Sequence, residues 1–123
     1  MDEKSKRNGT VLVVDDEQRI LRFLNISLKA SGYHVITAET GEKALDLAQL
    51  DNPDIVVLDV FLPGIDGFEV LQKLRTFSKV PVIMISARDS LGPNAMCQGA
   101  TEFMAKPFKP EQLVQRIKDI LGK

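Results

Sequence analysis

The chain has 123 residues, which fits one compact domain. Hydrophobic residues make up 44% of it, enough for a core that buries roughly two thirds of the unfolded chain's surface. The chain contains sixteen basic and seventeen acidic residues, which gives a net charge of −1. This balance argues against direct nucleic-acid binding and against a polybasic membrane patch.

The single cysteine, Cys97, excludes an internal disulfide and favours a reducing compartment. No apolar run approaches the ~18 residues of a membrane span, and the polar start MDEKSKRNGT contains no signal-peptide stretch. We therefore expect a cytoplasmic protein without a membrane segment. Residues 1–9 are predicted to form a flexible tail, and residues 10–123 a single domain.

The first half of the chain alternates short apolar runs with amphipathic segments. Val11–Val14 is a bare aliphatic run, typical of a strand buried on both faces. The spacing over Gln18–Ser31 predicts a helix, and Gly32 is a natural C-terminal stop. His34–Ala38 is a short β-prone segment, and Gly41–Leu50 is a second predicted helix that an Asn-Pro pair ends.

The second half of the chain continues the alternation. The predicted strands are Ile55–Leu58, Val82–Ile85 and Phe103–Ala105. The predicted helices are Phe68–Thr76, Asn94–Gln98 and Pro110–Leu121. Five strand–helix units in a row predict an α/β fold, a doubly wound parallel sheet with helices on both faces.

Polar side chains follow four of the five predicted strands. The run Asp15-Asp16-Glu17 follows the first, Asp59 the third, Ser86 the fourth and Lys106 the fifth. Ligands of a doubly wound sheet bind at the carboxyl ends of its strands, so we expect these side chains to share one cleft. Each residue alone has a simpler interpretation as a helix cap, a strand-end hydroxyl or a surface lysine. Four polar strand ends together favour a site.

The residue types in this cleft point to phosphoryl transfer. Three carboxylates repel one another and need a cation to remain ionised together. Oxygen ligands suit a hard ion, Mg²⁺ with Mn²⁺ as an alternative. The Ser86 hydroxyl, the Lys106 ammonium and an aspartate acceptor complete the set that such chemistry needs. The chain has no Walker-type loop, so a nucleotide is not the expected donor.

Four stretches of the sequence resemble the receiver domains of bacterial response regulators. They are VLVVDDE at 11–17, VVLDVFLPGIDGFEVL at 56–71, VIMISA at 82–87 and FMAKPF at 103–108. Each is weak alone, but the set is specific, and the resemblance covers about Thr10 to Leu121. It implies a flavodoxin-like fold with five parallel strands in the order 2-1-3-4-5.

The resemblance also implies a phosphoacceptor and a metal site. Asp59 matches the aspartate that takes the phosphoryl group from a histidine kinase or a phosphotransfer protein. Asp15 and Asp16 match the acidic pair that holds Mg²⁺, with Asp16 favoured as the direct ligand. Asp59 itself and the backbone carbonyl of Phe61 match the remaining protein ligands.

A switch is implied by three further positions. Ser86 and Lys106 match the side chains that contact the phosphoryl group, and Phe103 matches an aromatic that turns inward on activation. The Lys106-Pro107 bond is expected to be cis. Phosphorylation is expected to reshape the surface formed by the fourth helix, the fifth strand and the last helix. The domain would act alone or as the N-terminal part of a longer regulator.

Two features depart from the family pattern. The segment Ser86–Gly99 is shorter than expected and contains Gly92-Pro93, which predicts a short fourth helix. We expect a monomer or a weak dimer, because that helix usually forms part of the dimer surface, and we hypothesise that this face serves a different partner. Phe61 and Arg88 occupy places where family members control how water reaches the acyl phosphate, and Phe61 is expected to shield it.

Three other functions fit this sequence less well. A phosphatase with an aspartyl intermediate would need a second Asp two residues after the nucleophile, where this chain has Phe61. A flavin-binding electron carrier would need a Ser/Thr/Gly-rich loop in place of Asp15-Asp16-Glu17. A docking module independent of phosphorylation would be expected to lack part of the acidic cluster or Lys106. We therefore predict a phosphoacceptor rather than an enzyme that turns over an outside substrate.

Overall fold

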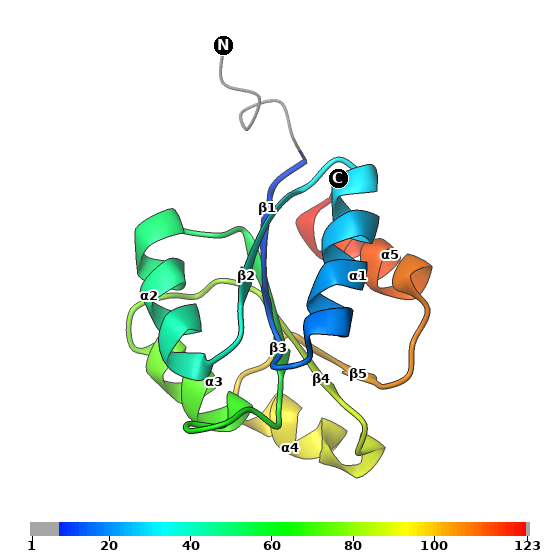
Figure 1. Cartoon of the computed structure of the whole chain (residues 1–123). Helices are drawn as coiled ribbons and strands as arrows, with labels where there is room; N and C mark the ends of the chain where they lie inside the picture. The colour runs from blue at the N-terminus through cyan, green and yellow to red at the C-terminus, as the bar shows by residue number, and fades with distance from the viewer. Residues whose placement is uncertain (1–7, 123) are drawn as a thin grey trace.

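The computed structural model describes residues 8–122 of the chain. Five parallel strands form one sheet in the order β2-β1-β3-β4-β5, which confirms the predicted fold (Figure 1). The strands are β1 (Thr10–Val14), β2 (His34–Ala38), β3 (Ile55–Asp59), β4 (Val82–Ser86) and β5 (Glu102–Ala105). The helices are α1 (Gln18–Ala30), α2 (Gly41–Asp51), α3 (Gly67–Arg75), α4 (Gly92–Cys97) and α5 (Pro110–Leu121).

All ten predicted elements are present, and their ends differ from the prediction by at most two residues. Helix α1 ends where the sequence indicated, since Gly32 adopts a left-handed φ of 94° and the Tyr33 N–H donates to the Leu28 carbonyl at 3.1 Å. Helix α4 is short, as predicted, and follows a single 3₁₀ turn, η2 (Asp89–Leu91), that the sequence pattern did not reveal.

The predicted tail lies outside the described residues except for Asn8 and Gly9. The Asn8 N–H donates to the Gly32 carbonyl at 3.0 Å, and the Gly9 carbonyl accepts from the His34 N–H at 2.9 Å. These two residues are therefore tied to the start of β2. None of the helices within residues 8–122 is long and apolar enough to cross a bilayer.

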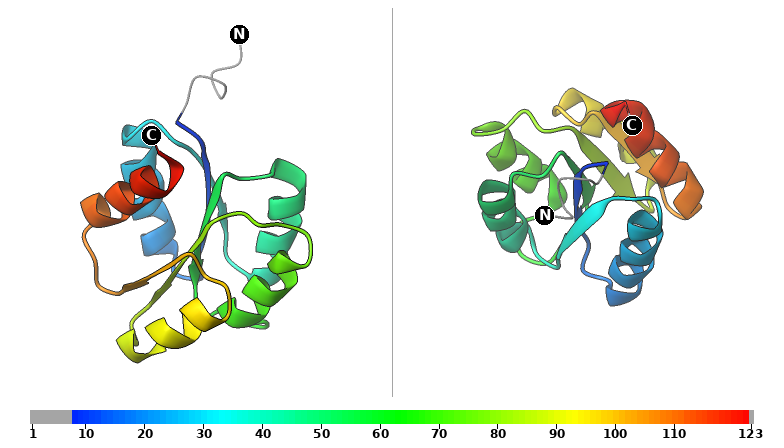
Figure 2. Two further views of the ribbon diagram at one scale, coloured as in Figure 1. Left: turned by 180° about the vertical axis from the view of Figure 1, so that it is seen from behind. Right: turned by 90° about the horizontal axis from the view of Figure 1, so that it is seen from above.

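Two apolar clusters lie on the two faces of the sheet, because successive strand residues point to opposite sides. Helices α1 and α5 cover one face, and α2, α3 and α4 cover the other (Figure 1 and Figure 2). Val11 and Val13 of β1 join the first cluster, and Leu12 and Val14 join the second. Burial on both faces explains why β1, β3 and β4 are bare aliphatic runs in the sequence.

Gly67, the first residue of α3, lies directly against the backbone of the β3–α3 connection. Its N–H donates to the Val60 carbonyl at 2.7 Å. A Cβ at this position would overlap the Asp59 carbonyl oxygen and lie 2.8 Å from Val60 Cα. Those contacts are with backbone, so the loop that follows Asp59 would have to shift.

We therefore expect Gly67→Ala to lower the free energy of unfolding by roughly 1–3 kcal/mol, the usual cost of forcing extra atoms into a packed site. The measurement is urea unfolding followed by circular dichroism. Gly122→Ala is a suitable control, because a Cβ at Gly122 meets nothing within 4 Å and only its φ of 75° is unfavourable. A smaller loss for Gly67→Ala than for Gly122→Ala would contradict the close approach.

Candidate functional site

The carboxyl ends of four strands meet at one edge of the sheet, as the sequence predicted. Asp59 pairs in register with Ile85 of β4, and Ser86 pairs with Ala105 of β5. Just past the strands, the Val60 N–H donates to the Ile85 carbonyl at 3.0 Å. The Lys106 N–H donates to the Ser86 carbonyl at 2.7 Å. The parallel ladder therefore extends into the loops that carry the polar side chains.

The three predicted carboxylates form one cluster. Asp15, Asp16 and Asp59 each offer an oxygen, and these oxygens all lie within 4.8 Å of one another. Asp15 is fully buried and Asp59 is 5% exposed, whereas Asp16 is exposed to solvent. The inner Asp15 is held by the Glu17 N–H, which donates to its Oδ1 at 2.9 Å. Two buried acids and one exposed acid thus form one cluster, which reaches solvent at Asp16.

Lys106 supplies the cation that balances this cluster within the described residues. Its Nζ donates to Asp15 Oδ2 at 2.9 Å and lies 3.6 Å from Asp59 Oδ2 and 3.8 Å from Glu17 Oε1. Burial works against the charged ammonium, but the hydrogen bond and attraction from Asp15, followed by Asp59 and Glu17, outweigh it and raise the pKa of Lys106. The lysine therefore stays charged. The sequence pattern gave no separate role to Glu17.

Asp59 is held in an environment that disfavours its charge. Burial, followed by the nearby charge of Asp15, raises the pKa of Asp59 from 3.8 to about 6, although Lys106 and a hydrogen bond from the Phe61 backbone oppose the shift. Near neutral pH the carboxylate is ionised but poorly compensated. A cation placed next to Asp59 would therefore stabilise the ionised form of its carboxyl group.

Ser86, at the end of β4, is fully buried beside this cluster. Its Oγ accepts a hydrogen bond from the Arg88 N–H at 3.0 Å. A serine hydroxyl can donate one proton while it accepts. The Ser86 hydroxyl therefore keeps a proton that it can donate.

Phe61 and Arg88, the two residues that the resemblance links to the access of water, lie together. Each is two residues past a site residue, Phe61 after Asp59 and Arg88 after Ser86. The Arg88 guanidinium carbon lies 5.5 Å from the centre of the Phe61 ring, within range of a cation–π contact. The Phe61 side chain is 51% exposed, so its ring is only partly covered.

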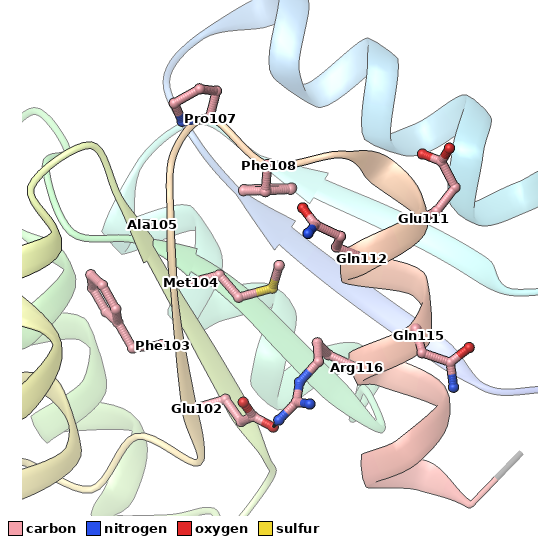
Figure 3. A pocket seen from close by; sticks show the side chains of 10 residues that line it. All are labelled: Glu102, Phe103, Met104, Ala105, Pro107, Phe108, Glu111, Gln112, Gln115 and Arg116. Carbon is pink, nitrogen blue, oxygen red and sulfur yellow. Dashed lines mark hydrogen bonds and ion pairs between the residues drawn. The ribbon is translucent and has the colours of Figure 1, made fainter.

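Side chains of strand β5 point to two sides, one toward helix α4 and the other toward helix α5. Figure 3 shows Phe103 pointing away from the groove between β5 and α5, into which Met104 and Phe108 point. The Phe103 ring lies against Gly92 of α4, where a Cβ would be 3.2 Å from ring atom Cδ2. The Lys106-Pro107 bond is cis, as the resemblance implied. Phe103 is thus partly buried and in contact with the short helix α4.

The groove between β5 and α5 is a cavity of about 720 Å³ (Figure 3). Met104, Pro107 and Phe108 contribute to its apolar lining. Glu102 of β5 and Arg116 of α5 form an ion pair across it. This groove is part of the α4-β5-α5 surface that the resemblance to receiver domains predicts to change on activation.

Comparison with known protein families identifies the fold. The family described as "Response regulator receiver domain" matches residues 11–118. Two relatives are the Bacillus subtilis (strain 168) "Alkaline phosphatase synthesis transcriptional regulatory protein PhoP", 44% identical over 93% of this chain, and a probable transcriptional regulator of Cyanophora paradoxa, 43% identical over 90%. The matches cover 49% and 47% of those proteins, so the chain spans about half the length of these curated relatives.

Solved structures agree with this comparison. The receiver domain of a Francisella response regulator has a TM-score of 0.89 and 30% identity, covering 93% of this chain and 97% of that one. A chemotaxis response regulator of Vibrio cholerae has a TM-score of 0.84 and 33% identity, covering 90% and 97%. With the matched family, the 2-1-3-4-5 sheet and the acidic edge, the chain belongs to the response regulator receiver domains of two-component signalling.

Proposed function

We propose that this domain accepts a phosphoryl group on Asp59 from a histidine kinase or a phosphotransfer protein, with the help of Mg²⁺. The observation that carries the proposal is the position of Asp59: buried, within 4.8 Å of the Asp15 and Asp16 oxygens, and 3.6 Å from the Lys106 ammonium. A carboxylate in such surroundings can act as a nucleophile, and the Lys106 ammonium and a bound Mg²⁺ would stabilise the negative charge of an incoming phosphoryl group.

In the proposed transfer, an Asp59 oxygen forms a bond to the phosphorus of a phosphohistidine, and the P–N bond breaks. The departing imidazole takes up a proton, and the phosphoryl charge is now carried next to Lys106. The ammonium lies close enough to Asp59 to follow that charge, although its first partner here is Asp15. Ser86 donates its hydroxyl proton to a second phosphoryl oxygen.

The donor set fits a hard divalent ion. Asp15, Asp16 and Asp59 provide only oxygen atoms, which Mg²⁺ prefers, and Mn²⁺ suits the same ligands. Asp16 and Asp59 would bind the ion directly together with the Phe61 carbonyl, and Asp15 would complete the acidic pair that holds it. The ion would neutralise the carboxylates and the phosphoryl oxygens when bound.

The proposed output is a change in the α4-β5-α5 surface. Ser86 and Lys106 move toward the phosphoryl group, and the Phe103 ring moves relative to Gly92, so that an active arrangement gains population. The curated relatives are transcriptional regulators about twice as long, so in a longer protein this surface would act on an output domain. The proposal includes a cytoplasmic location, a monomer or weak dimer, and no direct nucleic-acid contact by these residues.

The test is the intact mass of the protein after incubation with acetyl phosphate, with and without Mg²⁺. We expect a Mg²⁺-dependent gain of about 80 Da, the mass of one phosphoryl group, in the wild type and none in Asp59→Asn. Asp46→Asn, a change at an exposed residue of α2, serves as the control and should be labelled like the wild type. An adduct that persists in Asp59→Asn, or no adduct in the wild type, would contradict the proposal.

The lifetime of the phosphoryl group gives a second test of this site. We expect Phe61→Ala to shorten the half-life of the acyl phosphate several-fold, because the ring stacked under Arg88 limits the approach of water. Arg88→Gln should shorten it less, since the ring remains but loses its cation–π partner, worth about 0.5–1 kcal/mol. The decay is followed by intact mass after removal of acetyl phosphate. A wild-type half-life no longer than that of Phe61→Ala would rule the shielding out.

A further inference from the structure

The guanidinium of Arg75, the last residue of α3, joins two loops at the edge of the sheet opposite the phosphoryl site. Its Nη1 donates to the Val80 carbonyl at 2.7 Å and to the Ser78 carbonyl at 3.3 Å. Its Nη2 donates to the Gly99 carbonyl at 3.0 Å. Ser78 and Val80 belong to the connection between α3 and β4, and Gly99 follows α4. One half-buried charged group therefore holds carbonyl groups from two connections that are far apart in the chain.

The C-terminal end of α4 is held in place by this contact and by its neighbours. Gly99 has a left-handed φ of 106°, and the Gly99 and Ala100 N–H groups donate back to carbonyl groups of α4 at 3.2 Å and 3.1 Å, a common way for a helix to end. The next residue, Thr101, donates its N–H to the Val82 carbonyl at 2.8 Å. Hydrogen bonds from a charged donor are roughly twice as strong as neutral ones, so we expect the Arg75 contact to be the strongest of these links.

The beginning of α4 is connected to the phosphoryl site instead. The Arg88 N–H donates to Ser86 Oγ at 3.0 Å, and the Arg88 carbonyl accepts from the Leu91 N–H at 3.2 Å within the turn η2. The first two residues of this turn are exposed. Gly92 follows it and lies against the Phe103 ring, where a Cβ would be 3.2 Å from the nearest ring atom. This end of α4 therefore adjoins the two residues that we propose to move, Ser86 and Phe103.

We infer that Arg75 is a positioning residue of the switch: it holds the C-terminal end of α4 to α3, so that phosphorylation moves the end of the helix that begins at Gly92. This inference rests on the proposed function, in which Ser86 and Phe103 change position. Helix α4 has six residues and is about 9 Å long at the helical rise, less than two turns. A helix this short that is fixed at one end responds by tilting rather than by sliding along its axis. The tilt would reorient the exposed side chains in the middle of α4, such as Met96.

The test follows the two ends of α4 with nitroxide spin labels. Cys97 is the only cysteine of the chain and is exposed, so a label attached to it reports on the end that Arg75 holds. A second protein carries Cys97→Ser and Ser90→Cys, which moves the label to the exposed turn before α4. Electron paramagnetic resonance spectra are recorded in Mg²⁺ before and after the addition of acetyl phosphate. The intact mass of the same samples gives the phosphorylated fraction.

In the wild type we expect phosphorylation to change the mobility of the label at position 90 and to leave the label at Cys97 unchanged. Arg75→Met removes the guanidinium and should make the label at Cys97 respond as well. Lys73→Met removes a cation from an exposed position in the same turn of α3, so it is the matched control and should behave like the wild type.

Hydrogen exchange and a conservative variant complete the design. The Ala100 N–H should exchange about tenfold faster or more in Arg75→Met, because a hydrogen bond from a charged group no longer holds this end of α4 closed. Arg75→Lys gives the answer if Arg75→Met does not fold. Lysine keeps the charge but lacks the planar fork that reaches two loops at once, so the label at Cys97 should again respond to phosphorylation.

Other outcomes would overturn the inference. A wild-type label at Cys97 that responds as strongly as the label at position 90, or no response at either position in the phosphorylated wild type, would show that α4 is not fixed at one end and mobile at the other. A folded Arg75 variant whose label at Cys97 stays unresponsive, or an equal response in Lys73→Met, would show that Arg75 does not position the helix. Failure of acetyl phosphate to raise the mass of the wild type would contradict the proposed function itself, which is a separate result.

Discussion

Replacing Asp59 with asparagine is expected to stabilise the metal-free domain at neutral pH by roughly 3 kcal/mol. Burial and the charge of Asp15 raise the pKa of Asp59 from 3.8 to about 6, and each pKa unit corresponds to about 1.4 kcal/mol. The folded state therefore prefers the neutral carboxyl, and ionisation lowers stability. Asparagine has nearly the same shape and remains neutral at every pH, so it avoids this loss.

The pH dependence of this effect has a definite sign. Because the folded pKa is the higher one, the stability gained from the protonated carboxyl is fully present below pH 3.8 and is lost as the pH rises through about 6. The advantage of Asp59→Asn should therefore grow across that window and remain constant above it. Urea unfolding in EDTA at a series of pH values measures it.

The control for this experiment is a second Asp→Asn change at a position where the carboxyl group is exposed. Asp46→Asn, at an exposed position on α2, should show no such pH-dependent advantage. Mg²⁺ should stabilise the wild type more than Asp59→Asn, since the variant retains only part of the acidic cluster. An advantage of Asp59→Asn that is the same at every pH would show that the carboxyl is not held in the environment described.

Replacing Lys106 with methionine is expected to have the opposite effect on stability. Methionine keeps much of the stem but removes the ammonium, which leaves Asp15 fully buried without its 2.9 Å partner and Asp59 without its nearest cation. Removing one partner of a buried ion pair costs about 3–5 kcal/mol. We expect a loss near the lower end of that range in EDTA, because the Lys106 side chain is 15% exposed.

The same substitution should slow phosphorylation by about 10²–10³-fold, the range found when one group that stabilises transition-state charge is removed. Mg²⁺ should restore part of the stability, since it also neutralises the carboxylates, but not the rate. Lys79→Met, at an exposed position before β4, is the matched control and should change neither quantity. Urea unfolding and the rate of mass gain with acetyl phosphate measure both effects. Normal labelling of Lys106→Met would remove the lysine from the proposed mechanism.

The order of elements and the edge that carries the site could be predicted because both depend on local patterns. Buried parallel strands must be apolar on both faces, which gives runs such as Val11–Val14 and Ile55–Leu58. Helical spacing marks α1 and α5 in the same way. Once alternating strands and helices imply a parallel sheet, the residues after each strand must lie at one edge, so Asp15, Asp59 and Lys106 could be grouped without coordinates.

The least predictable segment lies between β4 and β5. The sequence indicated a short fourth helix, and α4 is short, but the preceding turn η2 carries no periodic signal. Gly92 and Pro93 are helix-disfavouring residues that nevertheless begin α4. Gly92 lies against Phe103, a contact between separate elements that local preference does not encode. The hypothesis that this face serves an unusual partner stays a prediction.

The sequence by itself determined the fold class and the edge that carries the acidic site, because both follow from periodicity and from position relative to a strand. The family and the strand order followed from the resemblance of four stretches of the sequence to receiver domains. Only the tertiary structure decided how those residues interact. It placed the Lys106 ammonium closer to Asp15 than to Asp59 and brought Arg88 over Phe61. Distances between side chains, and the burial that shifts their pKa values, depend on the packing of segments far apart in the chain, which no local pattern encodes.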